Sequence, residues 1–271
     1  MAADKTSSKD YEKPSPLLAP LAGLGKAVLI ALFHLGRYAI LSFKALFYSF
    51  LPPWRIRGIF RQMEIVGVDS LLVVILTGAF TGGVFTLQII YGFRLFSAES
   101  MVGPTVAMAM TRELGPVLTA LMVTGRVGSA MAAELSAMRV TEQIDALTVM
   151  AADPVKYLVS PRIIAGIIML PLLTAISDAV GVVGGYFVAI AKGLDPGQFA
   201  GRVQDIVVID DVLDGLIKAA FFGYILSSVG CYAGFYCKGG AEGVGKATTN
   251  AVVISYVAIL VGDFILTAIM F

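Results

Sequence analysis

Long apolar stretches separated by short polar segments dominate the chain. The clearest stretch runs from Ser70 to Phe93 and contains no Asp, Glu, Lys or Arg. About 20 apolar residues cross the hydrocarbon core of a bilayer, so this stretch predicts a transmembrane helix. The same pattern predicts five spans, over about 66–93, 101–131, 161–191, 212–236 and 247–271. We therefore expect an all-α polytopic membrane protein with a five-span membrane domain at 54–271.

Residues 17–53 are also apolar but carry isolated cations. These cations are Lys26, Arg37 and Lys44. On a helical wheel they fall within about 20° of one another. One basic stripe on an apolar helix is typical of a helix that lies in the membrane interface, and Trp54 is expected to anchor its end. A true span with snorkelling cations is the alternative.

The loop charges predict how the chain is oriented. Residues 1–16 are polar and mixed in charge, which predicts a disordered cytosolic tail. Lys and Arg gather in cytosolic loops. With the N-terminus inside, the inner side holds Arg55, Arg57, Arg61, Arg126, Arg139, Lys156, Arg162, Lys238 and Lys246, and the outer side holds only Arg94, Lys192 and Arg202. We expect a cytosolic N-terminus, a C-terminus on the outer side, and residues 134–156 in the cytosol.

The segment 134–156 is too charged to lie in lipid. Ile144, Leu147 and Met150 recur every third residue and predict a short amphipathic helix. Thr141 is its expected N-cap, and Asp153-Pro154 is expected to start a second helix. The helix either packs on its own protein or docks into a groove on a soluble partner. The charged candidates for such docking are Glu134, Arg139, Glu142, Asp145 and Asp153.

Several charged residues interrupt the apolar stretches. They are Asp69, Arg112, Glu113, Asp178, Lys218 and Asp263. Each costs about 2.5–3.5 kcal/mol at the bilayer centre, so each is expected to face protein or water and to have a partner. Arg112 and Glu113 point about 100° apart and need not pair, whereas Lys218 can neutralise Glu113 or Asp263. Two interpretations stay open: structural ion pairs, or a polar patch that handles a charged head group.

Composition limits the chemistry. Of the 271 residues, 58% are hydrophobic and 14% are charged, against about 25% charged in soluble domains. The net charge of +1 makes nucleic acid an unsuitable partner. One histidine and two cysteines leave little material for metal sites or catalytic triads.

A near-match to a phosphate-binding loop occurs at residues 240–247, GAEGVGKA. Ala247 stands where the loop needs a hydroxyl for Mg²⁺, and the preceding segment is a predicted membrane helix rather than a strand. We expect these glycines to form a loop and this chain to hold no cofactor. If transport is driven by ATP, then ATP and Mg²⁺ belong to a separate subunit.

Four motifs point to one family. They are RELGPV at 112–117, GRVGSA at 125–130, TEQIDAL at 141–147 and GDFILTA at 262–268. From about residue 55 to its end, the chain resembles the MlaE family, the permease subunits of Mla/Mce-type ABC lipid transporters. The resemblance implies a homodimer in a bacterial inner membrane, with residues 17–53 as an elbow helix. It further implies a cytosolic ABC ATPase docked on 134–156, and a small STAS-domain protein on that ATPase. A hexameric periplasmic Mce-domain ring would receive glycerophospholipid that moves between the inner and outer membranes.

The resemblance also implies roles for particular residues. Glu113, Lys218 and Asp263 match functionally important polar positions of the family, and Arg112 precedes Glu113 in the same motif. Phe96 matches a pocket aromatic but lacks a hydroxyl, and with Phe85 and Tyr91 it would line the acyl-chain path. Two other hypotheses remain: an ion-coupled secondary transporter that uses Glu113, Asp178 and Asp263, and an intramembrane enzyme with paired carboxylates.

Overall fold

The structure is a computed structural model that describes residues 19–51 and 56–270, without the side chains of residues 19–24, 27 and 50. The chain divides into two compact units, residues 1–41 and 42–271, which are described separately. The predicted tail at 1–16 and the predicted anchor Trp54 lie outside the described residues.

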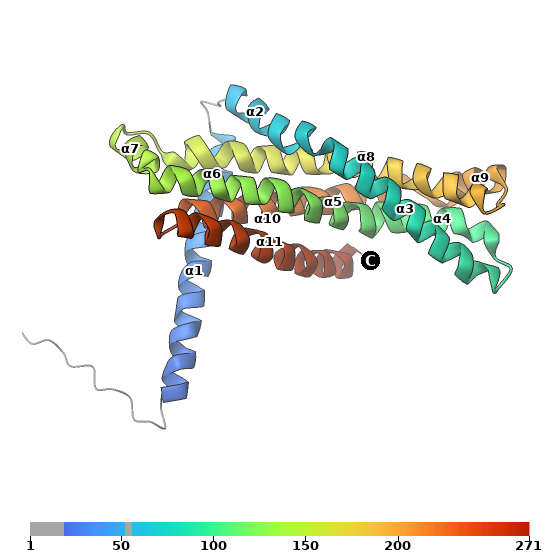
Figure 1. Cartoon of the computed structure of the whole chain (residues 1–271), viewed down its shortest axis with the longest axis horizontal. Coiled ribbons are helices and arrows are strands. Elements are labelled where there is room, and N and C mark those ends of the chain that lie inside the picture. The colour runs from blue at the N-terminus through green and yellow to red at the C-terminus, as the bar shows by residue number, and fades with distance from the viewer. Residues whose placement is uncertain (1–18, 52–55, 271) are drawn as a thin grey trace, which may run out of the picture. The chain divides into compact units, whose positions relative to one another are not determined.

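The described residues form helices and contain no strand, so the all-α prediction is confirmed. The α-helices are α1 (Ala19–Phe50), α2 (Ile56–Val66), α3 (Leu71–Arg94), α4 (Val102–Ala109), α5 (Gly115–Val123), α6 (Ser129–Val140), α7 (Gln143–Val149), α8 (Ser160–Ala191), α9 (Pro196–Ile206), α10 (Ile209–Phe235) and α11 (Gly240–Met270) (Figure 1). Short 3-10 turns lie at Val68–Ser70 and Glu99–Met101. Three π-helical turns lie at Met110–Leu114, Thr124–Gly128 and Val155–Val159.

Six helical segments of the described chain are long and apolar enough to cross a membrane. They are Val28–Ser49, Ile56–Arg94, Glu99–Val140, Val155–Ala191, Ile209–Phe235 and Gly240–Met270. The chain is therefore a multi-pass membrane protein. The first of the six falls in the predicted interfacial helix, so the interfacial position of that helix stays a prediction beside the alternative of a true span.

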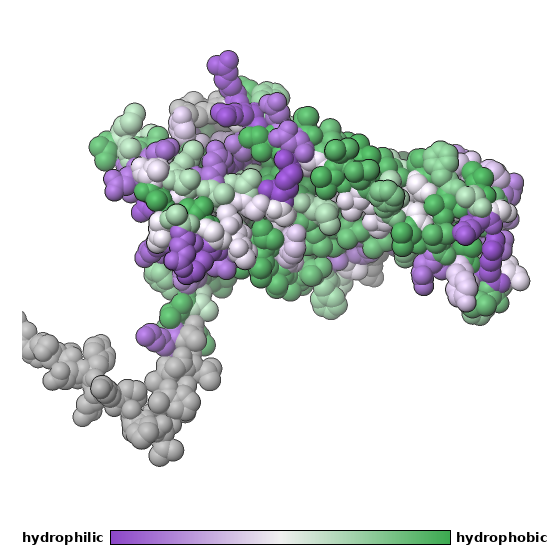
Figure 2. All heavy atoms as spheres, in the orientation of Figure 1, coloured by the Kyte–Doolittle hydropathy of each residue, from purple (hydrophilic) through white to green (hydrophobic). Residues whose placement is uncertain are grey.

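The second, third and fourth segments are longer than a bilayer is thick. At 1.5 Å per residue, the 39 residues of Ile56–Arg94 extend about 58 Å, against about 30 Å of hydrocarbon. Their ends must therefore project into the head-group layers or beyond. Polar side chains gather around α2 and α7 at one end of the 42–271 unit and around α9 at the other, with apolar side chains between (Figure 2). The sequence predicted shorter spans and missed α9, which Asp195 caps by accepting a hydrogen bond from the Gln198 N–H at 2.8 Å.

Helix α8 is the centre of the unit, because α3 and α10 both pack along it. Glycines permit the closest approaches. A Cβ at Gly82 would collide with the Gly181 backbone, and a Cβ at Gly223 would collide with the Gly166 backbone. These small residues thus let the helices pack closely, as is common between membrane helices.

Two local predictions are wrong. The Thr141 hydroxyl does not cap α7, because it donates to the Ala137 carbonyl at 2.8 Å and so ends α6 instead. Glu142 precedes α7 in a left-handed conformation, with φ of 59°. The glycine-rich stretch after Lys238 is not a loop either: residues from Gly240 onward are the first turns of α11, where Lys246 pairs with Glu242 at 2.7 Å.

Candidate functional site

A break in the helix of the second span creates the centre of the site. Pro116 lacks an N–H and cannot bond the carbonyl four residues earlier, that of Arg112. The turn before it, Met110–Leu114, is π-helical, a form that is frequent at functional sites. The Arg112 carbonyl instead accepts a hydrogen bond from Lys218 Nζ at 3.0 Å. The Gly-Pro pair therefore supplies a backbone acceptor inside the bundle.

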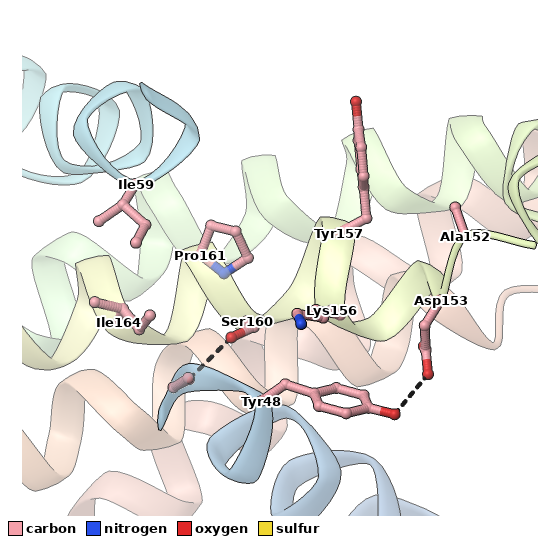
Figure 3. Close-up of a pocket in the computed structure, with 10 residues that line it drawn as sticks. Tyr48, Ile59, Ala152, Asp153, Lys156, Tyr157, Ser160, Pro161 and Ile164 are labelled. Carbon is pink, nitrogen blue, oxygen red and sulfur yellow. Dashed lines mark hydrogen bonds between the residues drawn. The ribbon is translucent and has the colours of Figure 1, made fainter. Parts of the chain in front are cut away.

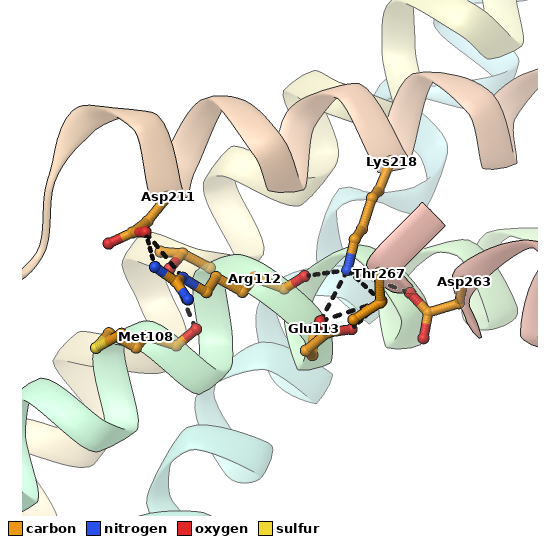
Figure 4. A network of polar contacts seen from close by, with 8 residues as sticks. Met108, Arg112, Glu113, Asp211, Lys218, Asp263 and Thr267 are labelled. Atoms are coloured by element: carbon orange, nitrogen blue, oxygen red, sulfur yellow. Dashed lines mark hydrogen bonds and ion pairs between the residues drawn. The ribbon is translucent and has the colours of Figure 1, made fainter. Parts of the chain in front are cut away.

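Lys218 of α10 is fully buried, and its ammonium group is satisfied by three acceptors (Figure 4). Besides the Arg112 carbonyl, it donates to Glu113 Oε1 at 2.8 Å and to Thr267 Oγ1 at 2.8 Å. An ammonium group has three N–H donors, so these contacts use all of them. The burial of a lysine is tolerable here because the charge is both paired and hydrogen-bonded.

Asp263 of α11 lies near the Lys218 ammonium group but forms no hydrogen bond with it. Its Oδ1 lies 3.6 Å from Lys218 Nζ and has no hydrogen-bond partner within the described structure. Its side chain is 21% exposed, against 37% for Glu113 and 0% for Lys218. We call Glu113, Lys218, Asp263 and Thr267 the lysine network. Two carboxylates thus share one cation, and both are nearer the surface than the cation is.

Arg112 points away from the lysine network, as the expected angle between it and Glu113 implies (Figure 4). Its Nε donates to Asp211 Oδ1 at 2.8 Å, and its Nη2 contacts the same oxygen. The other Asp211 oxygen accepts from the Val208 N–H at 3.2 Å and caps α10. Asp211 was not among the predicted site residues, although an intramembrane arginine required an acidic partner.

Asp178 of α8 is a separate buried carboxylate. Its Oδ1 has no hydrogen-bond partner in the part of the chain that the structure describes. A Cβ at position 115 would collide with this oxygen, so the glycine of the Gly-Pro pair makes room for Asp178. The structure does not place Asp178 among the contacts of the lysine network.

Comparison with known proteins shows which family the chain belongs to. A family model described as Permease MlaE matches residues 59–269. The chain belongs to the MlaE permease family. A probable ABC transporter permease protein of Rickettsia felis is 45% identical over 250 residues, which cover 92% of this chain and 96% of the relative. The intermembrane phospholipid transport system permease protein MlaE of Haemophilus influenzae is 41% identical over 257 residues, 93% and 97% of the two chains. A probable ABC transporter permease protein of a Synechocystis species is 44% identical over 216 residues, 79% and 82%.

The chain is accordingly an ABC transporter permease, a transporter subunit rather than an enzyme. This removes the hypothesis of an intramembrane enzyme. The intramembrane carboxylates of an MlaE-family permease have to be explained by packing or by transport.

The second π-helical turn of this MlaE-family chain holds another arginine in place. Arg126 Nε donates to Ser70 Oγ at 3.2 Å, and its Nη2 donates to the Ile65 carbonyl. Asp69 lies 3.9 Å from Nη2. Arg126, predicted only as a loop cation, therefore ties the second span to the junction of α2 and α3.

The predicted coupling segment forms α7 and its flanking turns. Ile144 is buried, whereas Val149 and Met150 are exposed, so the predicted apolar stripe only partly packs inward. Arg139 pairs with the exposed Asp145 at 2.6 Å, and Glu134 pairs with the buried Arg162 at 2.6 Å. Glu142 is exposed. The ion pairs of Glu134 and Arg139 thus hold the segment in place, and exposed apolar side chains lie at the end of α7.

The C-terminal part of α1 meets this segment at Asp153 (Figure 3). Asp153 Oδ2 accepts from the Tyr48 hydroxyl at 2.8 Å and lies 2.8 Å from Lys44 Nζ, and its Oδ1 accepts from the Val155 N–H at 3.0 Å. We call Lys44, Tyr48 and Asp153 the Asp153 cluster. Burial alone would raise the pKa of Asp153, but these hydrogen bonds outweigh it and hold the pKa below its ordinary value. Asp153 therefore does start the helix before Ser160, as predicted.

The three aromatic residues predicted to share an acyl-chain path are not on one surface. Phe85 packs against the buried cluster that contains Ile90 and Val106. Tyr91, in the last turn of α3, is 75% exposed, and Phe96, just after that helix, is 80% exposed. Positions 85 and 91 are six residues apart on the helix, so their side chains point in different directions. The apolar pattern of the sequence did not reveal this.

Proposed function

We propose that this permease belongs to a phospholipid transport system that moves glycerophospholipid between the inner and outer membranes of a bacterium. The lysine network carries this proposal. A cation and two partly accessible carboxylates inside a membrane span are expensive, and such groups mark substrate paths in membrane proteins. The name of the Haemophilus relative refers to the same class of cargo.

The network has a contact that a small helix movement would change. Lys218 already makes three hydrogen bonds, and Asp263 on α11 stands just beyond that distance. A shift of α11 toward α10 would let Asp263 compete with Glu113 for Lys218. The carboxylate that is released would then meet the charged head group of a lipid.

The energy for this shift comes from a separate ATPase subunit, which binds ATP and Mg²⁺ and docks on residues 134–156. The exposed Val149 and Met150, flanked by Glu142 and Asp145, suit a groove on that subunit. A small STAS-domain protein binds the ATPase, and a hexameric periplasmic Mce-domain ring accepts the lipid. Two permeases form a homodimer in the inner membrane, with cytosolic N-termini and periplasmic C-termini.

The second span connects the two sites. Residues Glu99–Val140 form one nearly continuous helical rod, interrupted by π-helical turns at Arg112-Glu113 and at Arg126. A push on the cytosolic end of the rod therefore acts on Glu113 through covalently linked helix, and not through a chain of side chains.

Transport by the reconstituted complex tests the proposal. The permease is co-expressed with its neighbouring subunits, placed in proteoliposomes, and assayed for ATP-dependent transfer of fluorescent phospholipid. Lys218→Ala and Asp263→Ala should abolish most transfer while the complex still assembles, whereas the control Lys246→Ala, which removes an exposed cation, should not. Full transfer by either network variant would refute the role of the network. Transfer by the permease alone, driven by an ion gradient, would favour the ion-coupled hypothesis.

Docking is tested separately. Glu142→Lys combined with Asp145→Lys reverses two exposed charges on the coupling segment and should detach the ATPase from a folded permease. Glu64→Lys combined with Glu242→Lys makes the same change in charge at two other exposed positions and should leave the complex intact. Co-purification of the ATPase with the first variant, at the level seen for the second, would show that the docking assignment is wrong.

A further inference from the structure

A hollow lies beside α2, away from the lysine network. Its volume is about 510 Å³, and its walls come from the start of α2, the end of α6 and the turns that lead into α8. Arg57, Arg61 and Gln62 line it from α2, Glu134 and Met138 from α6, and Arg162 from α8. Three cations face one anion across the hollow.

The arginines of this hollow have guanidinium donors that lack hydrogen-bond acceptors in the described structure. No acceptor for the Arg57 or Arg61 side chain is found among the described residues, and both side chains are exposed. Arg162 is 3% exposed and donates to Glu134 and to the Leu158 carbonyl, yet its Nε has no hydrogen-bond partner in the described structure. A buried guanidinium donor without an acceptor is costly unless a ligand supplies one.

The spacing of the α2 arginines adds to this argument. Arg57 and Arg61 are four residues apart and lie on the same helix face, where two like charges repel. An anion held between them would turn that repulsion into attraction. Guanidinium groups suit phosphate in particular, because their planar donors bind its oxygens in pairs.

The depth of the hollow identifies where such a phosphate would come from. The helical segments that carry its residues are longer than the hydrocarbon core, and these residues lie near the segment ends, at the end of the 42–271 unit where α7 lies (Figure 1). That level is the head-group layer. Apolar residues, among them Ile56, Met138 and Leu158, also line the hollow and suit the glycerol and upper acyl region of a lipid.

We propose that this hollow binds the phosphate head group of an anionic phospholipid from the leaflet on the α7 side, which is the cytosolic leaflet in the predicted orientation. Arg57 and Arg61 hold the phosphate oxygens, and Gln62 lies beside them. The bound lipid keeps α2 seated against α6 and α8. The site does not depend on which lipid the permease transports.

Native mass spectrometry of the full chain in detergent tests the site. The protein is titrated with phosphatidylglycerol and, separately, with phosphatidylcholine of the same acyl chains. We expect Arg57→Gln combined with Arg61→Gln to weaken the tightest phosphatidylglycerol binding about tenfold, the effect of one charged contact, and to leave phosphatidylcholine binding unchanged. Lys238→Gln combined with Lys246→Gln removes two exposed cations elsewhere on the same predicted side and should have no such effect.

The alternatives give different results. Equal loss in both double variants would mean general attraction between charges and would overturn the proposal, as would unchanged phosphatidylglycerol binding. If the arginine variant, co-expressed with its neighbouring subunits, loses the ATPase while lipid binding stays intact, the hollow receives an acidic protein surface instead and the proposal is overturned. Lys218→Ala should retain this lipid even where transport fails, so failure of the transport proposal and failure of this site are distinguishable.

Discussion

The lysine network and the Asp153 cluster use the same kinds of group in opposite surroundings. Each has a lysine, a carboxylate and a hydroxyl within hydrogen-bonding distance. Lys218 is completely buried, whereas the Lys44 side chain is 44% exposed and that of Asp153 is 29% exposed. Removing one partner of a buried pair leaves an uncompensated charge, while water replaces a partner lost at the surface. Burial, and not the kind of contact, therefore decides how much stability is lost when one of these groups is removed.

The largest effect is expected from removing the buried cation. Lys218→Met leaves Glu113 and Asp263 facing each other and deprives the Arg112 carbonyl of its donor. Breaking a buried pair costs about 3–5 kcal/mol, and because both carboxylates are partly exposed we expect about 2–3 kcal/mol here. The protein should remain folded, with a clearly lower Tm in detergent. Lys44→Met is the matched surface variant, and a similar loss of Tm for both would contradict the comparison.

Gly115→Ala tests whether the space beside the helix break is essential. The added methyl group would collide with the Asp178 carboxylate and crowd the Met110 carbonyl. Overpacking of this kind costs about 1–3 kcal/mol. Gly92→Ala adds the same methyl group in α3, where no atom lies within 4 Å, and should be neutral or slightly stabilising. Thermal unfolding of the two variants, measured side by side, checks this prediction.

The two carboxylates of the network should respond differently to neutral replacements. Glu113 accepts a hydrogen bond from Lys218, so Glu113→Gln should lose about 1.5 kcal/mol of stability, the lower end for hydrogen bonds to charged groups. Asp263 makes no such bond, so Asp263→Asn should change stability by less than that and act mainly on transport. A larger loss of Tm for Asp263→Asn than for Glu113→Gln would reverse this assignment.

The smallest effect belongs to the Asp153 cluster. The pKa of Asp153 is lowered in the folded protein, so its stabilising contribution is fully present above the ordinary aspartate pKa of about 3.9. The contribution is lost as the pH falls through the lower, folded-state pKa. Asp153→Asn should therefore cost about 0.5–1 kcal/mol at neutral pH and nothing at the acidic end. Tm measured against pH for wild type and variant checks both the size and the sign.

Sequence patterns anticipated much of the candidate site. The cost of charge in lipid singled out six residues, and the structure brings three of them, Glu113, Lys218 and Asp263, together. The same cost could not select Asp211 or Thr267. Asp211 is one of several acidic residues near a predicted helix end, and nothing in the sequence distinguished it from the others. Thr267 carries no charge, so the cost of charge in lipid does not apply to it.

The sequence by itself determined the membrane class, the main spans and the family, because apolar length and local motifs are properties of contiguous residues. Only the tertiary structure decided which partner each charge has. Lys218 meets the Arg112 carbonyl because Pro116 leaves it free and because α10, which carries Lys218, packs against that turn. Likewise, Arg57, Arg61 and Arg162 surround one hollow only after three helix ends converge. Pairings between residues far apart in the chain depend on packing, and no local pattern records them.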